Sequence, residues 1–312
     1  MIFKLKDPKT YYEQLELLKS RGMTINNEDE ALLALKSFNY YRLSGYMLRM
    51  KQSKGSENFK VGTNFDHVLL LYNFDMELRH ILLCAIDDIE IKVRTTIAYE
   101  FSHAAGAYGH YNEIFFNSYD SRDAFCDSLD KAIQKNQDTL FVKHHIQKYS
   151  IIENGKSVYN LPLWVAVEIL SLSTISKFYK NIGIYTIKKD IANTFDTAPE
   201  LLESWLHSIA NLRNICAHHG RIYDRKLLPS VKYSYKAKKH YQSLGADLDT
   251  DMLFGFIPAL LKLLPDKRSK NLLLSALSNL MNSYGHSVDL SAIGFPSNWE
   301  CYFNEWYKSP AI

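Results

Sequence analysis

The string R-N-I-C-A-H, from Arg213 to His218, combines three side chains that can act together on a phosphodiester. An imidazole such as that of His218 exchanges protons near neutral pH. The guanidinium of Arg213 offers a fork of donors to phosphoryl oxygens as negative charge builds on them, and the Asn214 amide can orient either group. This set suits RNA cleavage without a metal, in which the ribose 2′-hydroxyl attacks the adjacent phosphorus. We therefore assign Arg213, Asn214 and His218 as the candidate catalytic residues.

These residues lie in a helix that we predict over residues 198–219, opened by a capping box at Thr197 and closed by a left-handed Gly220. One face of this helix is apolar and is expected to face the core: Leu202, Trp205, Ile209, Leu212 and Cys216. The opposite face carries uncharged hydrogen-bonding side chains: His207, Asn211, Asn214 and His218. A face in bulk water usually carries Lys and Glu, so this seam predicts a cleft or a subunit interface. A polar seam buried within the same chain is the alternative.

The angular spacing on this helix separates two of the candidate residues. At ~100° per residue, Arg213 projects ~140° from His218, so one helix does not bring both side chains to one phosphate. Two copies of the helix that face each other across a two-fold axis would bring them together. We therefore predict a homodimer in which the two helices lie close together. His219 is expected to point ~100° from His218, toward the core side.

The elements around this helix are also predicted to be helical, because apolar residues recur every three or four positions almost throughout. The fold class that we expect is all-α. A long helix is predicted over residues 66–103, and the polar stretch 51–63 should be a loop or a small β element. Other helices are predicted over residues 10–20, 28–36, 120–148, 162–181, 186–195, 250–264 and 266–283, and the aromatic tail at 299–306 should dock on the body.

The chain divides into three parts on this basis. Residues 1–60 form an N-terminal helical module that is expected to contact RNA. Residues 61–225 form the helical core, and residues 226–312 form a basic loop and a C-terminal helical extension.

Two windows of the chain are strongly basic, although the net charge is only +3. Residues 36–54 hold five Lys or Arg and no acid, and residues 221–240 hold seven and one acid. Basic side chains bind phosphates, and the tyrosines interleaved with them can stack on unpaired bases, so both windows predict an RNA surface. The alternative is a solvated loop with tyrosines packed in the core. The candidate RNA-binding residues are Lys36, Tyr40, Arg42, Arg49, Lys51, Arg221, Arg225, Lys226, Lys232, Lys236, Lys238 and Lys239.

The composition excludes several classes of protein. With 46% hydrophobic and 23% charged residues in 312, the chain can bury a core and is not mainly disordered. Its four cysteines form no CxxC pair, which argues against a zinc ribbon or a dithiol redox site, and we expect no metal and no cofactor. The N-terminus is too polar for a signal peptide, and the most apolar stretch falls short of a membrane span. We therefore expect a cytoplasmic protein with no membrane partner.

Three segments give the chain a family resemblance. They are FNYYRLSGYM at residues 38–47, LYNFDMELRHILLCAIDDIEIKVRTTIAYEF at 71–101, and WLHSIANLRNICAHHGRIYDR at 205–225. In this order, within a helical chain, they resemble the abortive-infection (Abi) family of phage-resistance proteins, of the AbiD/AbiF type. The R-N-x-x-x-H string near a helix end is similar to that of the HEPN superfamily. The resemblance covers roughly residues 30–230.

The resemblance implies a helical, dimeric HEPN-type bundle with extra N- and C-terminal helical elements. In related HEPN ribonucleases the Arg, the polar residue after it and the His form the active site, which maps here to Arg213, Asn214 and His218. The resemblance to this Abi group also implies a partner, which is a small structured non-coding RNA.

We thus expect an abortive-infection protein that binds RNA, and a metal-independent HEPN endoribonuclease is the favoured activity. The alternative is a non-catalytic RNA-binding protein that forms a ribonucleoprotein with its cognate non-coding RNA.

Overall fold

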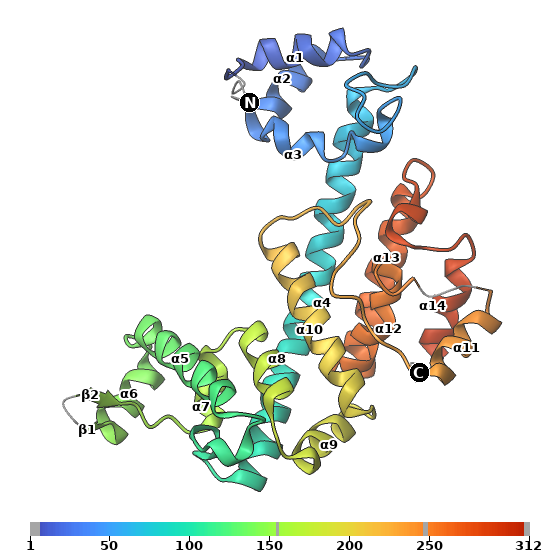
Figure 1. Cartoon of the computed structure of the whole chain (residues 1–312). Coiled ribbons are helices and arrows are strands. Elements are labelled where there is room, and N and C mark those ends of the chain that lie inside the picture. Colours follow the sequence, from blue (N-terminus) through green and yellow to red (C-terminus); the bar gives the residue numbers. More distant parts are fainter. Residues whose placement is uncertain (1–6, 154–155, 246–248, 309–312) are drawn as a thin grey trace.

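The computed structural model describes residues 7–153, 156–245 and 249–308. In this part of the chain the fold is helical apart from one short antiparallel hairpin, which confirms the all-α prediction (Figure 1). The helices are α1 (Tyr11–Ser20), α2 (Glu28–Ser37), α3 (Tyr40–Ser44), α4 (Phe65–Ala105), α5 (Tyr119–Asn136), α6 (Leu140–Tyr149), α7 (Leu163–Ile169), α8 (Leu172–Asn181), α9 (Tyr185–Thr194), α10 (Pro199–Ala217), α11 (Tyr235–Ser243), α12 (Leu253–Leu263), α13 (Lys267–Tyr284) and α14 (Trp299–Lys308). The hairpin strands are β1 (Ile151–Glu153) and β2 (Lys156–Val158), and 3₁₀ turns span Leu48–Met50, Gly109–Tyr111, Glu113–Phe115 and Leu290–Ile293.

Helix α4 is the element on which the rest of the fold packs (Figure 1). It begins where the side chain of Asn64 accepts a hydrogen bond from the His67 backbone N–H at 2.8 Å, and it ends at Gly106, whose φ is 79°. Helices α10, α12 and α13 pack against it, as do α7 and α9. Buried apolar residues recur along it from Phe65 to Phe101, and the long helix predicted over residues 66–103 is confirmed.

The segment before α4 forms a small N-terminal unit of α1, α2 and α3, at one end of the molecule (Figure 1). The predicted loop over residues 51–63 contains an isolated antiparallel bridge between Lys51 and Phe59, and the Phe59 ring is buried. The loop is tied to this unit by the buried Phe59 ring and by two backbone hydrogen bonds of 2.9 Å, from the Phe59 N–H to the Arg21 carbonyl oxygen and from the Thr24 N–H to the Thr63 carbonyl oxygen.

Two of the predicted helices are each split in two. The helix expected over residues 120–148 is α5 and α6, and the one expected over 162–181 is α7 and α8. At the second break Ser171 adopts an extended conformation, and its Oγ accepts from the Thr174 backbone N–H at 3.1 Å. Such a cap starts a new helix in a new direction, which apolar periodicity alone does not reveal.

The segment after α10 also differs from the expected loop. Helix α11 begins where Ser234 caps the Ala237 backbone N–H at 3.1 Å, and Ala237 and Tyr241 are buried. The aromatic tail is docked on the body as predicted, and four of its side chains are buried: Trp299, Tyr302, Phe303 and Trp306. Within the described ranges, no helix is both long and apolar enough to cross a membrane.

Candidate functional site

Helix α10 carries the candidate catalytic residues and presents the predicted apolar face to the core. The helix begins with Pro199 directly after Ala198, which has no side-chain cap, so the capping box predicted at Thr197 is wrong. Proline suits the first turn because its φ is preset and the N–H that it lacks would have no partner there. The predicted core residues of this face are all buried: Leu202, Trp205, Ile209, Leu212 and Cys216.

The C-terminal end of α10 differs from the prediction by two residues. The helix ends at Ala217, His218 is the cap residue with φ −92° and ψ 18°, and His219 has a φ of 54°. The left-handed conformation is therefore at His219, and the prediction that Gly220 adopts it is wrong. Gly220 has a different constraint, since a Cβ there would lie 3.0 Å from the carbonyl oxygen of Ile215. Glycine is needed at this position for close packing against the last helical turn.

Arg213 points from α10 toward α4. Its Nε lies 3.8 Å from Oε2 of Glu90, a carboxylate that also pairs with Arg94. The Arg94 guanidinium donates to the carbonyl oxygens of Glu168 at 2.9 Å and Leu170 at 2.8 Å, at the end of α7. Arg213 keeps 39% of its side chain exposed, and its Nε makes no hydrogen bond within the described residues. This guanidinium is oriented by one long ion pair, and within the described residues no hydrogen bond occupies its Nη groups, which can bind an incoming anion.

The contacts of the polar seam of α10 differ along its length. Asn214 donates from Nδ2 to Ser173 Oγ of α8 at 3.2 Å, so at this residue the seam is an intrachain contact. Asn211 donates to the carbonyl oxygen of His207 on its own helix at 2.8 Å. The two ends of the seam, His207 and His218, are exposed. The middle of the seam is thus half-buried, with one contact to α8 through Asn214, and the ends are open to a ligand or a partner.

His218 and its neighbour occupy the open end of α10. His219 is exposed, and its carbonyl oxygen accepts a hydrogen bond from Arg42. The prediction that His219 turns to the core is wrong, because the chain has left the helix at this point and the 100° spacing no longer applies. In the part of the chain that the structure describes, no hydrogen bond or ion pair joins Arg213 to His218.

A buried carboxylate anchors the turn that follows His218. Asp75 of α4 is fully buried and accepts hydrogen bonds from Tyr46 Oη at 2.6 Å and from Arg79. It also accepts from the backbone N–H groups of Ile222 at 3.1 Å and Tyr223 at 2.8 Å. Burial raises the pKa of Asp75, while the hydrogen bond of Tyr46 and the charge of Arg79 act in the opposite direction. The two backbone donors hold the turn that follows the R-N-x-x-x-H string against α4.

The three segments that carry the family resemblance meet at this carboxylate. Tyr46 belongs to residues 38–47, Asp75 and Arg79 belong to residues 71–101, and the two backbone donors belong to residues 205–225. The sequence analysis missed this cluster. The signal available was an Asp and an Arg four residues apart on an otherwise apolar helix face, a spacing at which the two side chains pair.

Most of the first basic window makes internal contacts. Arg49 pairs with Asp224 and Asp289, each at 2.7 Å, and Lys51 lies 3.9 Å from Glu57. These contacts tie the segment after α3 to the turn after α10 and to the C-terminal region. The charges of Arg49 and Lys51 are therefore partly neutralised by acidic residues outside the window. Two of these acids are far away in the sequence, and Glu57 lies just beyond the end of the window.

The remaining predicted RNA-binding residues of this window differ in exposure. Tyr40 is half-buried and accepts from Arg21 at 3.3 Å, and Arg42 is exposed although one of its nitrogens binds the carbonyl oxygen of His219. Lys36 is exposed and has no acidic partner in the described structure. Tyr46 is buried, so the alternative of a structural tyrosine holds there.

The first half of the second window is also held internally. Arg221 donates to the carbonyl oxygens of Tyr223 and Asp224, and Lys226 pairs with Asp251 at 2.6 Å. Arg225 is exposed, with one contact to the Arg221 carbonyl oxygen at 3.5 Å.

The second half of this window is open to solvent. Its lysines are exposed, and none pairs with an acid in the described ranges. The Lys239 ammonium lies 4.8 Å from the centroid of the exposed Tyr235 ring. The other tyrosines of this region are buried, as expected if they pack in the core: Tyr223, Tyr233 and Tyr241. We call the open lysines the α11 strip: Lys232, Lys236, Lys238 and Lys239.

Comparison with protein families found a match. The family model for Abi-like protein matches residues 33–224, which span Tyr46, Asp75 and the whole of α10. Comparison with curated proteins and with solved structures found no match. No group of three His, Cys, Asp or Glu side chains in the described residues could hold a metal ion. The chain belongs to the Abi-like protein family, a family of abortive-infection proteins that act in phage defence.

Proposed function

We propose that this protein acts on RNA as a metal-independent endoribonuclease, with Arg213, Asn214 and His218 in the active site. The observation that carries the proposal is the open end of α10, where an exposed His218 follows an Arg213 with free Nη groups. His218 accepts the proton of the ribose 2′-hydroxyl or donates a proton to the leaving 5′-oxygen. Arg213 binds the non-bridging phosphoryl oxygens, and Asn214 fixes the flank of the site against α8. The products are a 2′,3′-cyclic phosphate and a 5′-hydroxyl.

The complete site on this proposal contains two copies of the chain. Arg213 lies against Glu90 of its own chain, and His218 is the C-terminal cap residue of α10, with no hydrogen bond or ion pair to Arg213 in the described residues. A homodimer with its α10 helices adjacent places Arg213 of one copy beside His218 of the other. The exposed ends of the α10 seam are the surfaces that such a dimer would cover.

The catalytic proposal is tested with purified variants and a labelled RNA in EDTA. The His218→Ala protein should lose cleavage, and Arg213→Ala should lose ~10²-fold or more, since a charged donor to a developing oxyanion is removed. His144→Ala is the matched control and should keep cleavage, because His144 is an exposed histidine of α6, away from α10 (Figure 1). Full cleavage by folded His218→Ala, or products without a cyclic phosphate, would refute the mechanism.

Mixing the two inactive variants tests the shared site. In a mixed dimer of Arg213→Ala and His218→Ala, one of the two sites would have both an intact Arg and an intact His. Half of randomly assorted dimers are mixed, so activity should return to about a quarter of wild type. If Arg and His of one chain form the site, mixing restores nothing.

A non-catalytic RNA-binding protein is the second candidate function. It is favoured by the contacts of Arg213 with Glu90 and of Asn214 with Ser173, which use the motif for intrachain packing. In that case His218→Ala would keep anti-phage activity, or would lose it only together with RNA binding.

RNA binding itself is assigned on both proposals to the α11 strip. Reversing Lys236, Lys238 and Lys239 to Glu should weaken binding and lower the slope of log K against log salt by ~0.7–0.9 for each phosphate that is no longer bound. The control reverses Lys131 and Lys135, two exposed lysines of α5. Equal slopes for the two variants would remove the α11 strip from the RNA surface.

A further inference from the structure

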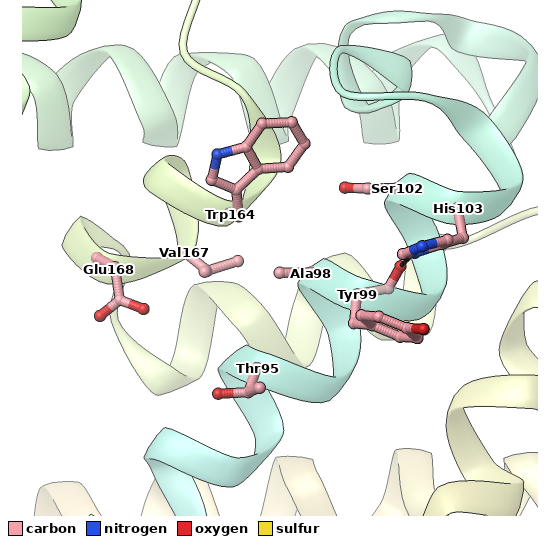
Figure 2. Close-up of a pocket in the computed structure, with 8 residues that line it drawn as sticks. All are labelled: Thr95, Ala98, Tyr99, Ser102, His103, Trp164, Val167 and Glu168. Atoms are coloured by element: carbon pink, nitrogen blue, oxygen red, sulfur yellow. Dashed lines mark hydrogen bonds between the residues drawn. The ribbon is translucent and has the colours of Figure 1, made fainter.

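A cavity of about 560 Å³ opens between the C-terminal half of α4 and helix α7, away from the R-N-x-x-x-H segment. Figure 2 shows that the side chains of α4 and α7 surround one open space. The residues that line it are Thr95, Ala98, Tyr99, Ser102, His103, Trp164, Val167 and Glu168. A concave site with an apolar floor and a few polar groups is the usual form of a small-molecule site.

Two exposed aromatic rings, Trp164 and Tyr99, border this cavity. Trp164 is 52% exposed and Tyr99 is 59% exposed, whereas Trp205, Trp299 and Trp306 are all buried. In Figure 2 the Trp164 and Tyr99 rings lie on different sides of the space, one from α7 and one from α4. Large exposed rings that border a cavity are typical of a binding site.

The charge at the cavity is negative. Glu168 lines the cavity, and its side chain is 57% exposed. The nearest cation is Arg94, 4.0 Å from the Glu168 carboxylate, but its Nη groups are bound to the carbonyl oxygens of Glu168 and Leu170 and to Glu90. No Lys or Arg is among the lining residues of this cavity. The Glu168 carboxylate is therefore only partly compensated, by Arg94 at 4.0 Å. A phosphate-bearing ligand would meet this exposed carboxylate, and a cation would be attracted to it.

We propose that this cavity binds an organic cation whose apolar body packs between Trp164 and Tyr99 and whose positive charge faces Glu168. The electron-rich faces of Trp and Tyr attract a cation placed over them, and Trp attracts it most strongly. A carboxylate beside two such rings adds a direct charge interaction. The proposal concerns a different part of the molecule from the RNA site and does not depend on the proposed ribonuclease activity.

The test uses the full-length protein labelled with 5-fluorotryptophan, which gives one ¹⁹F resonance for each of its four tryptophans. The Trp164→Phe variant identifies the resonance of Trp164. Tryptamine and indole-3-propionate are the probes, because they share a ring and differ in the sign of their charge. Tryptamine should shift the Trp164 resonance and leave the other three unchanged, and indole-3-propionate at the same concentration should not shift it.

Two variants separate the charge from the ring. Glu168→Gln keeps the backbone carbonyl that binds Arg94 and should weaken tryptamine binding about fivefold in calorimetry. Trp164→Ala should remove binding, and Glu113→Gln, at an exposed carboxylate of another segment, should leave it unchanged. The proposal is overturned if neither probe binds, if both bind equally, or if Glu168→Gln has no effect. It is also overturned if the Trp164 resonance shifts with protein concentration alone, because a second copy of the chain would then cover the cavity.

Discussion

Replacing Asp75 with alanine removes the acceptor at which four donors converge. The Arg79 side chain is 3% exposed and would keep its charge without the carboxylate that pairs with it, and the N–H groups of Ile222 and Tyr223 would lose their acceptor. Breaking a buried ion pair by removing one partner costs about 3–5 kcal/mol, because the remaining charge is buried and unpaired. Domains are stable by about 5–15 kcal/mol, so the variant should lose a large part of its stability.

The free energy of unfolding is measured by urea titration for four proteins: wild type, Asp75→Ala, Arg79→Met and the double variant. The double variant removes both charges together, so it should be more stable than the sum of the single losses implies, by roughly 1–3 kcal/mol of coupling. Asp87→Ala, at an exposed carboxylate on the same helix, should change stability by less than about 0.5 kcal/mol.

Two results would refute this reasoning. A loss below about 1 kcal/mol for Asp75→Ala would mean that the carboxylate is not the buried acceptor of this structure. Additive single losses would mean that Asp75 and Arg79 do not interact. The Asp75→Asn variant extends the test, because it keeps one oxygen for the Tyr223 N–H and presents an amide N–H₂ to donors that need an acceptor.

Further predictions concern pH, packing and the RNA surface. His110 is fully buried with neither ring nitrogen hydrogen-bonded within the described residues, and burial lowers its pKa to about 4. As the pH falls, the imidazole is protonated in the unfolded chain before it is protonated in the folded protein, so the free energy of unfolding should decrease between pH 6.5 and 4 by up to ~1.4 kcal/mol per pH unit. In the His110→Leu variant the urea midpoint should not show this decrease. Gly220→Ala should lower stability by about 1–3 kcal/mol, since its Cβ would meet Ile215 at 3.0 Å; an unchanged melting temperature would contradict this. Ser234→Ala should lower the free energy of unfolding by about 1 kcal/mol, because the Ala237 N–H loses its capping acceptor. The same variant should weaken RNA binding although no charge is removed, which an RNA titration at fixed salt would measure.

Long-range periodicity was sufficient to predict the main helices. The apolar residues of α4 recur over 41 residues, and those of α10 recur from Leu202 to Cys216, so both helices and their buried faces were predictable. The aromatic tail was also predicted to dock, because four large rings within eight residues cannot all stay in water.

The residue pattern did not reveal where helices break or which polar groups pair. At the break before α8 the Ser171 hydroxyl caps the new helix, and at the end of α10 the left-handed residue is His219, next to a Gly220 that packs closely on Ile215. Both are local choices that depend on the surrounding structure.

The candidate site shows the same division. The order of residues is enough to place an Arg, an Asn and a His on one helix, on different sides of it, next to a basic segment. The packing of the chain was needed to show that Arg213 meets Glu90, that Asn214 meets Ser173 and that His218 stays open. Packing also pairs Arg49 with acids 175 and 240 residues away, which leaves the α11 strip as the open basic surface of its window. Charge partners and burial depend on chain segments that the core brings together, and spacing along one segment carries no record of them.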